Sequence, residues 1–506
     1  MGAFICQISE TDWLISREIG VYGNREGSER NGKTAYFADM KKGRGEQIIQ
    51  SIVEDLIAMR KGDTVFFHVL GTAEGESSIH GIYRVREEPF YNDVRIWKSS
   101  PYLTYPYRFC FEPHDEHIEL CKYDASILVS EFYKSVETRS VCSVLTLERE
   151  VRGAAHAVKK ISIDDAEEIL KLLYRDFNSR RRRDPIHFKP LQLKGSSLRS
   201  HIRGIGEIEF AVKGLVAYKL GQRDSDLVKW IPACGKGQYD FLIESFVGQT
   251  ARKPTDILCI SSGGLEKVVT VVEAKTGLVE INDLIQSLKY QELFRLRNIH
   301  KGSLTYRMSV CLLGQRFHQE LIDYTWIRKM VLPWEEIVLL RYTPTENGKN
   351  ATFASETSAG RVSPAIRKVY PQINMHDLLS QISRSPNGLY PILGRTILPR
   401  TEIELKHSKE NIHVLQKYYS RDGRKLLLGH IVICQVHGSC VLEDLRKFMT
   451  NIYEEAGQFQ GNLMAVDPVI AAENYDDPAR FFIDQYNIYE TRAGRRTICA
   501  YVLAKS

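Results

Sequence analysis

The chain is 506 residues long, which favours about three domains, and its 43% hydrophobic and 26% charged residues are ordinary for a globular protein. A formal net charge of +6 is compatible with a nucleic-acid partner but does not by itself indicate one. The sequence shows no apolar stretch long enough to cross a membrane and no signal-peptide pattern at its first residues. We therefore expect a cytoplasmic protein with no membrane partner.

The first 150 residues combine one helix with several short strands. Helical periodicity covers 46–63, and β-branched and aromatic runs follow at 64–71, 77–93 and 105–113. One helix with several short strands implies a small β-barrel with an attached helix.

Three runs of this segment, 61–67, 81–85 and 89–91, resemble the PUA-like group, in particular its EVE and YTH-related domains. The resemblance implies that 1–150 is a domain that reads DNA or a modified base. Such a base, once extruded, needs aromatic faces to replace its lost stacking and polar groups to read its edge. The candidates are the aromatic residues Trp13, Tyr22, Trp97 and Tyr102, with Asn24 as the edge reader. Core positions are the alternative interpretation for Trp13 and Tyr22.

Residues 151–204 are expected to form a helix and a basic linker. A β-like stretch at 140–151 precedes an amphipathic helix predicted over 163–177. The linker, 178–204, contains prolines, a Gly-Ser-Ser triplet and many basic residues against one acid, Asp184. It is either a solvated connection or a strap that contacts DNA phosphates. The backbone-contacting candidates are Arg180, Arg181, Arg182, Arg183 and Lys194.

Residues 205–345 alternate helical and strand-like patterns. We predict helices at 205–221 and 317–330, and a third helix whose apolar stripe is Ile281, Leu284, Ile285, Leu288, Leu293 and Leu296. We predict strands at 226–232, 308–313 and 336–342, and a hairpin of 255–261 and 267–275 around a Ser-Gly-Gly turn. This order suits a mixed sheet flanked by helices.

Charged side chains gather at one end of the predicted hairpin. Glu273 and Lys275 share a strand face because they are two residues apart. If the turn centres on Gly263–Gly264, Asp256 lies opposite Val271 on that same face. Two carboxylates and a phosphate can hold Mg²⁺, and a lysine can orient or deprotonate the attacking water.

Another interpretation is that Glu-x-Lys forms an ordinary solvated pair on an exposed strand. The apolar run 268–272 argues against it, because a strand that is apolar on both faces is expected to be buried. Gln286 and Tyr290, one helical turn apart on the following helix, could reach the same site.

The pattern D-x(n)-E-x-K followed by Q-x-x-x-Y resembles the PD-(D/E)XK nuclease superfamily, in particular its RecB-like and NucS-like branches, over roughly 195–345. The resemblance implies a nuclease domain at 205–345. In it, Asp256 and Glu273 would be metal ligands and Lys275 the catalytic lysine. Gln286 and Tyr290 would be supporting residues.

The superfamily often adds an acidic residue on the helix before the hairpin. Glu207 and Glu209 are the candidates, with Glu209 taken as the third metal ligand, and ordinary surface glutamates are the alternative. Asp240 is a competing ligand that ranks below Asp256, because no Glu-x-Lys strand follows it closely.

Residues 370–506 match no family pattern and read as an α+β region of unknown fold, after a polar boundary at 346–364. Helices are predicted near 375–382, 441–459 and 479–490, and strands near 425–438 and 496–506. A dimerisation domain, a DNA clamp and an extension packed on the nuclease all remain open for this region.

The ten cysteines are scattered without Cys-x-x-Cys pairs, so buried free thiols are expected. Cys434, His437 and Cys440 resemble half of a metal site but lack a partner pair. His114 and His117 are interpreted as loop residues rather than ligands.

Together these features predict a multidomain α/β and α+β protein that hydrolyses DNA phosphodiester bonds with Mg²⁺, which Mn²⁺ can replace. The expected function is a modification-dependent restriction endonuclease that acts as a homodimer on double-stranded DNA carrying a modified base. A NucS-like repair nuclease specific for DNA structure or mismatches is one alternative. A modified-nucleic-acid binder that does not cleave is the alternative from another class.

Overall fold

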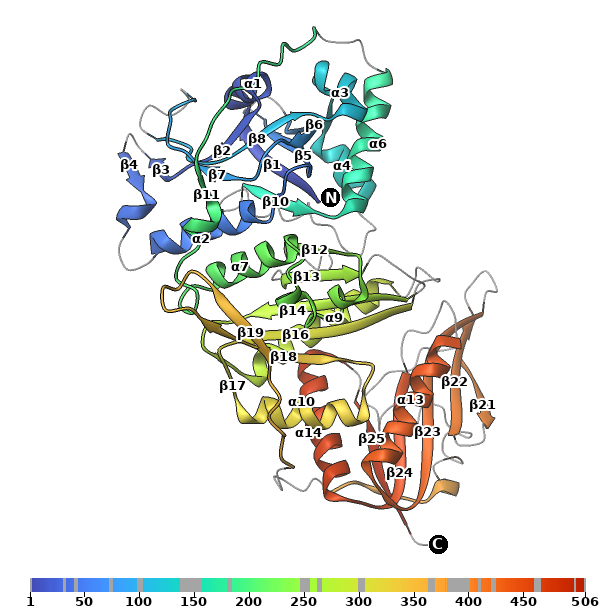
Figure 1. The fold of residues 1–506 in the computed structure, drawn as a ribbon. Helices are drawn as coiled ribbons and strands as arrows, with labels where there is room; N and C mark the ends of the chain where they lie inside the picture. Colours follow the sequence, from blue (N-terminus) through green and yellow to red (C-terminus); the bar gives the residue numbers. More distant parts are fainter. Residues whose placement is uncertain are drawn as a thin grey trace.

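The computed structural model describes residues 2–504 except for short stretches and a few longer ones. The stretches outside the description are 31–32, 41–43, 72–75, 98–102, 137–156, 180–183, 246–254, 262–265, 299–304, 363–368, 378, 380–400, 408–410, 420–424, 459–465 and 496. The fold is mixed α/β with three large sheets, which follow one another along the molecule from the N-terminal to the C-terminal region (Figure 1). Within the described residues, no helix is both long and apolar enough to cross a bilayer.

The N-terminal sheet has nine strands and is curled (Figure 1). Its main path runs β10-β1-β5-β6-β8-β7-β11, with β2 paired to β8 and β9 paired to β6. Its strands are β1 (Ala3–Ser9), β2 (Val21–Asn24), β5 (Thr64–Leu70), β6 (Ser78–Val85), β7 (Phe90–Tyr91), β8 (Tyr107–Pro113), β9 (Ser126–Leu128), β10 (Val158–Ile161) and β11 (Ser196–Ser197). A separate hairpin joins β3 (Gly27–Arg30) to β4 (Lys33–Tyr36).

Both faces of this sheet are buried, as alternation along β1 shows. Phe4 and Cys6 enter the core shared with one set of helices, whereas Ala3 and Ile5 enter the core on the other face. The helices are α1 (Glu10–Ile19), α2 (Arg44–Ile57), α3 (Ile118–Lys122), α4 (Val129–Val136) and α6 (Ile163–Ser179). The helix expected at 163–177 is thus confirmed as α6, and the β-like stretch at 140–151 lies outside the described residues.

The described residues of 151–204 belong structurally to this N-terminal unit, because β10 and β11 join its sheet. The described part of the linker, 184–195, runs along the unit rather than away from it. The backbone N–H of Lys189 donates to the Glu18 carbonyl at 2.7 Å, and that of Leu191 donates to the Ile19 carbonyl at 2.8 Å.

The central sheet has the order β12-β13-β14-β16-β18-β19, in which β14, β16 and β18 are parallel. Its strands are β12 (Tyr239–Ser245), β13 (Thr255–Ser261), β14 (Glu266–Ala274), β16 (Thr305–Gly314), β18 (Ile337–Pro344) and β19 (Ala351–Ser355). Its longer helices are α7 (Glu209–Gly221), α9 (Ile281–Asn298) and α10 (Gln319–Val331). The hairpin, the helix after it and the strands expected at 308–313 and 336–342 are confirmed.

One predicted strand of this domain, 226–232, is wrong. Residues Ser225–Val228 form a short helix, α8, which Asp224 caps by accepting from the Asp226 N–H at 2.9 Å. Leu227 and Ile231 are both fully buried, but a spacing of four puts two residues on one face of either a helix or a strand, so their burial fits both. The first strand of the sheet is β12 instead.

The hairpin register also differs from the expected one. Leu258, not Asp256, pairs with Val271, and Ile257 pairs with Val272. If the pairing continues by one residue beyond Ile257 and Val272, Asp256 lies beside Glu273. The error in register is two residues, which leaves every side chain on its predicted face. The turn itself, 262–265, lies outside the described residues.

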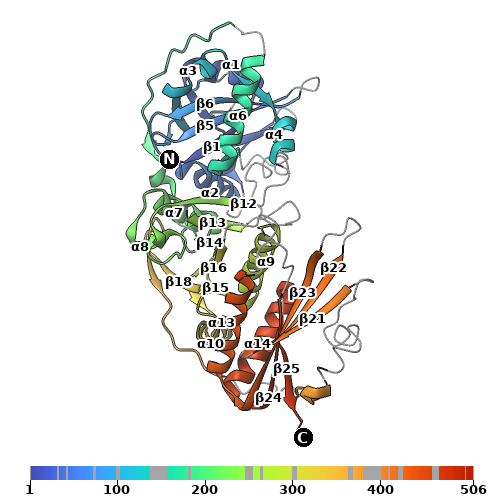
Figure 2. The same ribbon diagram turned by 90° about the vertical axis from the view of Figure 1, so that its right-hand side faces the viewer.

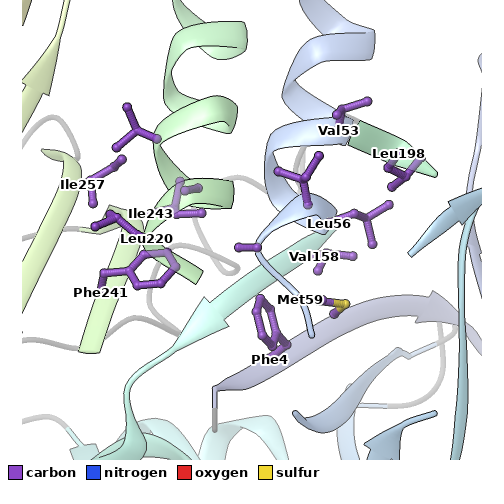
Figure 3. Packing of buried hydrophobic residues seen from close by; sticks show 14 of the residues in the cluster. Phe4, Val53, Leu56, Met59, Val158, Leu198, Leu220, Phe241, Ile243 and Ile257 are labelled. Carbon is purple, nitrogen blue, oxygen red and sulfur yellow. The ribbon is translucent and has the colours of Figure 1, made fainter. Parts of the chain in front are cut away.

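The N-terminal and central units share one hydrophobic core (Figure 3). Val53, Leu56 and Met59 come from α2 and the turn after it. Across from them lie residues of α7, β12 and β13, namely Leu220, Phe241, Ile243 and Ile257. Because these residues bury apolar area against one another, the two units are expected to hold a fixed relative position.

The C-terminal sheet has the order β20-β25-β24-β23-β22-β21 and stands beside the central domain (Figure 2). Its strands are β20 (Gln372–Ile373), β21 (Thr401–His407), β22 (Asn411–Tyr419), β23 (Lys425–Cys440), β24 (Val466–Tyr475) and β25 (Cys499–Leu503). Its long helices are α13 (Leu442–Gln458) and α14 (Asp477–Ala493). The helix expected near 375–382 lies partly outside the described residues.

Helix α14 attaches the C-terminal region to the central domain. Tyr489 and Ala493 enter the core formed by α9 and α10. Glu490 is fully buried and pairs with Arg328 of α10 at 2.7 Å and with Arg495 at 2.8 Å. The region is thus packed on the central domain within one chain, while dimerisation and DNA clamping stay predictions. The nine described cysteines are free, as expected.

Candidate active site

Three carboxylates converge on one ammonium group at the end of the central hairpin. The Nζ atom of Lys275 lies 3.6 Å from Glu209 Oε2, 3.7 Å from Asp256 Oδ2 and 3.6 Å from Glu273 Oε2. Glu209 is the first residue of α7, Asp256 and Glu273 lie on the paired strands β13 and β14, and Lys275 follows β14 directly. The residues that the nuclease resemblance implies as charged site residues therefore meet in space.

Backbone hydrogen bonds hold this arrangement. Asp256 Oδ2 accepts from the Ala274 N–H at 2.8 Å, which ties the carboxylate to the neighbouring strand. The Lys275 N–H donates to the Leu313 carbonyl at 2.8 Å, which extends the parallel pairing of β14 with β16 past the end of the strand. The apolar run 268–272 is buried on both faces, as predicted, so the charges stand at the edge of a dry core.

Burial and mutual repulsion make two of the carboxyl groups weak acids. Burial, reinforced by the Asp256 charge, raises the pKa of Glu273 well above its usual range, and the same two causes raise the pKa of Glu209. Burial acts to lower the pKa of Lys275, but Asp256, Glu273 and Glu209 together raise it above its ordinary value. Lys275 is therefore charged at neutral pH.

The residues present fit a hard divalent cation. Glu273 is 2% exposed, and its Oε1 atom has no hydrogen-bond partner within the described part of the chain. Carboxylate oxygens are the donors that Mg²⁺ prefers, and the Lys275 ammonium shows that this position already favours positive charge. His114, Glu116 and His117 form a different group of possible metal ligands. Their ligand atoms lie within 4.8 Å of one another among the described residues, and the group is far from this site in the sequence.

The two supporting residues lie beside this cluster. Gln286 Nε2 donates to the Tyr290 hydroxyl at 3.0 Å, one turn along α9. Tyr290 is 5% exposed, and burial together with the nearby Glu273 charge raises the pKa of its phenol. The competing candidates lie elsewhere. Glu207 sits in the turn before α7, and Asp240 accepts from Lys160 Nζ at 2.5 Å.

The sequence analysis did not identify two residues of the site. Lys213 of α7 is 3% exposed, and its Nζ lies 3.8 Å from Asp256 Oδ1 and 2.5 Å from Glu244 Oε1. Glu244 is next to Asp256 in the sheet and has a φ of 45°, which costs a non-glycine residue about 1–2 kcal/mol. A single lysine inside the apolar stretch FAVKGLVAY was the available signal for Lys213.

The candidate base-binding aromatics are buried. Trp13, Tyr22 and Trp97 are each 2% exposed. The Trp13 ring lies 4.7 Å from that of Phe67, the Tyr22 hydroxyl donates to the Gln7 carbonyl at 3.1 Å, and Trp97 Nε1 donates to Ser16 Oγ at 2.9 Å. A base could stack on these rings only after neighbouring side chains moved, so the aromatic pocket stays a prediction.

The remaining N-terminal candidates differ in exposure, and some of them lie outside the described residues. Asn24 is 4% exposed, its Oδ1 accepts from the Arg25 N–H at 2.9 Å, and its Nδ2 has no hydrogen-bond partner among the described residues. Tyr102 lies outside the described residues, as do the backbone-contacting candidates at 180–183. Lys194 is exposed on the linker, where its carbonyl accepts from Asn92 Nδ2 at 2.8 Å.

Comparison with known proteins adds little to this geometry. No family profile and no curated protein matches the chain. A crystal structure of a Pseudomonas putida protein aligns with 13% identity and a TM-score of 0.21, covering 34% of this chain and 99% of that one. Human THYN1, in complex with DNA containing 5-methylcytosine, aligns with 11% identity and a TM-score of 0.19, covering 34% and 98%. TM-scores this low decide neither fold nor function.

Proposed function

We propose that the protein is a metal-dependent endodeoxyribonuclease whose central domain hydrolyses phosphodiester bonds. The observation that supports it is the convergence of Glu209, Asp256 and Glu273 on the Lys275 ammonium at the end of a buried hairpin. A carboxylate cluster around a cation position, next to a strongly basic lysine, suits a reaction in which negative charge builds up on a phosphate.

Each residue has a distinct task in this proposal. Asp256, Glu273 and Glu209 would hold Mg²⁺, or Mn²⁺ in its place, and the bound ion would supply charge stabilisation and water activation for phosphodiester hydrolysis. Lys275, whose pKa the three carboxylates raise when no metal is bound, would stabilise charge on the phosphate and orient or deprotonate the attacking water. The Gln286–Tyr290 pair lies close enough to Glu273 for that carboxylate to raise the pKa of the Tyr290 phenol, and it would support the site from α9.

The finer proposal is that the enzyme cuts DNA that carries a modified base, which the N-terminal domain reads. The enzyme would act as a homodimer, because cutting both strands needs two active sites. The rigid core shared by α2, α7 and β12 gives the N-terminal domain a fixed position relative to the site. A bound base would then lie at a constant distance from the cut.

Cleavage of plasmids tests the target. The protein with Mg²⁺ is incubated with plasmids containing unmodified cytosine, 5-methylcytosine or hydroxymethylcytosine, and the expected result is cutting of a modified plasmid only. Equal cutting of all three plasmids would contradict recognition of a modified base. Preferred cutting of branched or mismatched DNA would favour the repair nuclease. Binding of modified DNA with no metal-dependent cutting of any substrate would favour the binding protein.

Substitution of Lys275 tests the site. Lys275→Ala should lower the cleavage rate by about 10²–10³-fold, because a preorganised charge at the phosphate is lost. DNA binding, measured by gel shift, should persist. Lys289→Ala on the exposed side of α9 is the matched control and should cut normally. Unchanged cleavage by Lys275→Ala would place the active site elsewhere.

A further inference from the structure

A second charge cluster lies between the N-terminal domain and the candidate active site. Its acids are Glu54 and Asp55 of α2 and Glu244 of β12, and its bases are Lys159 of β10 and Lys213 of α7. All five residues are buried, with exposed fractions between 0% for Glu54 and 7% for Glu244. They sit within the otherwise apolar junction of the two domains.

Lys213 stands at the centre of this cluster. Its Nζ atom lies 3.8 Å from Glu54 Oε1 on the N-terminal side and 3.8 Å from Asp256 Oδ1 on the active-site side. The third contact, 2.5 Å to Glu244 Oε1, anchors the ammonium between them. A second cation, Lys159, lies 3.6 Å from Glu244 Oε2 and 4.0 Å from Asp55 Oδ1.

Stability alone does not account for this cluster. Buried ion pairs contribute less to folding than apolar residues of similar volume, and the surrounding junction is filled with such residues. Both carboxylate oxygens of Glu54 are buried without a hydrogen bond from any described residue. Glu244 holds its position with a left-handed backbone. In a region of low dielectric constant, charges this close influence one another strongly.

We propose that Lys213 is a positioning residue that couples the N-terminal domain to metal binding at the active site, because Glu54 and Asp256 share its charge. The inference rests on the proposed nuclease function. A negative Glu54 offsets the Lys213 ammonium and so leaves Asp256 more available to a divalent cation. Loss of that charge leaves more of the ammonium's field on Asp256 and weakens cation binding. By linkage, a bound cation also acts back on the α2 side of the junction.

The charge of Glu54 depends on pH through a raised pKa. Burial raises the pKa of Glu54 well above its usual value, although Lys213 opposes that rise. The charged groups facing it are Lys213 from α7, Glu244 from β12, Lys159 from β10 and its neighbour Asp55. Because Glu54 is negative only above its raised pKa, its contribution to cation affinity should be present at high pH and lost as pH falls.

Calorimetric titration of the full chain with Mn²⁺, without DNA, tests the coupling. Glu54→Gln should weaken Mn²⁺ binding about 5-fold or more at the highest pH at which Mn²⁺ stays in solution, and the difference from wild type should shrink as pH falls. Glu46→Gln is the matched control, because Glu46 lies on the same helix but pairs with Arg203 at 2.8 Å, outside the cluster. Its Mn²⁺ affinity should equal that of wild type.

A double-mutant cycle shows whether the effect passes through Lys213. In a Lys213→Met background, adding Glu54→Gln should no longer change Mn²⁺ affinity, whereas Lys213→Arg should preserve the effect of Glu54→Gln. If Lys213→Met does not fold, the comparison of Glu54→Gln with Glu46→Gln still decides.

The outcomes separate this inference from the function on which it rests. If wild type binds Mn²⁺, Asp256→Asn does not, and Glu54→Gln binds like wild type at every pH, the coupling is overturned while the metal site stands. If wild type binds no Mn²⁺, both the metal site and the coupling are overturned.

Discussion

At the scale of single residues, the site combines charged groups whose burial would each lower the stability of the fold. Glu273 is a buried carboxylate with one unpartnered oxygen, and its only close cation among the described residues is Lys275, which two other carboxylates share. Such a group persists when function needs it, because a neutral residue would fit the core at lower cost.

Glu273→Gln should therefore stabilise the protein while abolishing metal-dependent cleavage. A carboxyl whose pKa is raised on folding destabilises the native state as pH rises through the window between its unfolded and folded pKa values. Removing it should raise the free energy of unfolding by about 1 kcal/mol at neutral pH, measured by urea denaturation. The gain should vanish in acid, where Glu273 is protonated. Exposed Glu280→Gln is the control, and a loss of stability in Glu273→Gln would contradict this account.

The same pKa shifts predict how cation binding depends on pH. Glu273 and Glu209 bind a cation only when ionised, and burial with the Asp256 charge raises both pKa values. The Mg²⁺ concentration needed for half-maximal cleavage should therefore increase as pH falls, beginning at a pH above the ordinary glutamate range of about 4.3. Cleavage assayed over a Mg²⁺ series at several pH values measures this. A constant Mg²⁺ requirement down to that range would contradict it.

At the scale of elements, the hairpin and α7 act as the frame of the site. The two-residue error in register did not matter for the faces, because strand alternation depends on even or odd spacing. The strand predicted at 226–232 is a different kind of error, because the type of element itself is wrong. Its short apolar pattern fitted both periods, and the chain forms the helix α8, which begins after the capping residue Asp224.

The contact of α2 with α7 should be a large contributor to stability. Leu56 is fully buried in the core that joins the two domains (Figure 3). Leu56→Ala should lower the free energy of unfolding by about 2–5 kcal/mol, because it leaves a cavity there. Leu14→Ala on α1, where the side chain is 47% exposed, is the control and should have little effect. A similar small effect at Leu56 would mean that the domains pack loosely.

At the scale of the whole molecule, the central domain depends on its neighbours. It shares an apolar core with the N-terminal unit and a buried ion cluster with α14. Separation would expose that apolar surface and remove Glu54 from Lys213 and Glu490 from Arg328.

A fragment of 205–345 should therefore be less stable than the full chain and should aggregate. Thermal unfolding and limited proteolysis of the two proteins side by side measure this. A fragment that unfolds cooperatively at the temperature of the full chain would show that the shared core is dispensable.

The sequence by itself determined the local chemistry: Glu273 and Lys275 on one face, Asp256 on the paired strand, and Gln286 with Tyr290 on the next helix. These relations follow from the fixed periods of strands and helices, which short-range spacing reveals. Only the tertiary structure decided that Lys213, Glu244 and Glu54 meet beside Asp256, and that Trp13, Tyr22 and Trp97 are buried. Such contacts join residues far apart in the chain, and packing between elements, rather than spacing within them, determines which of these residues meet.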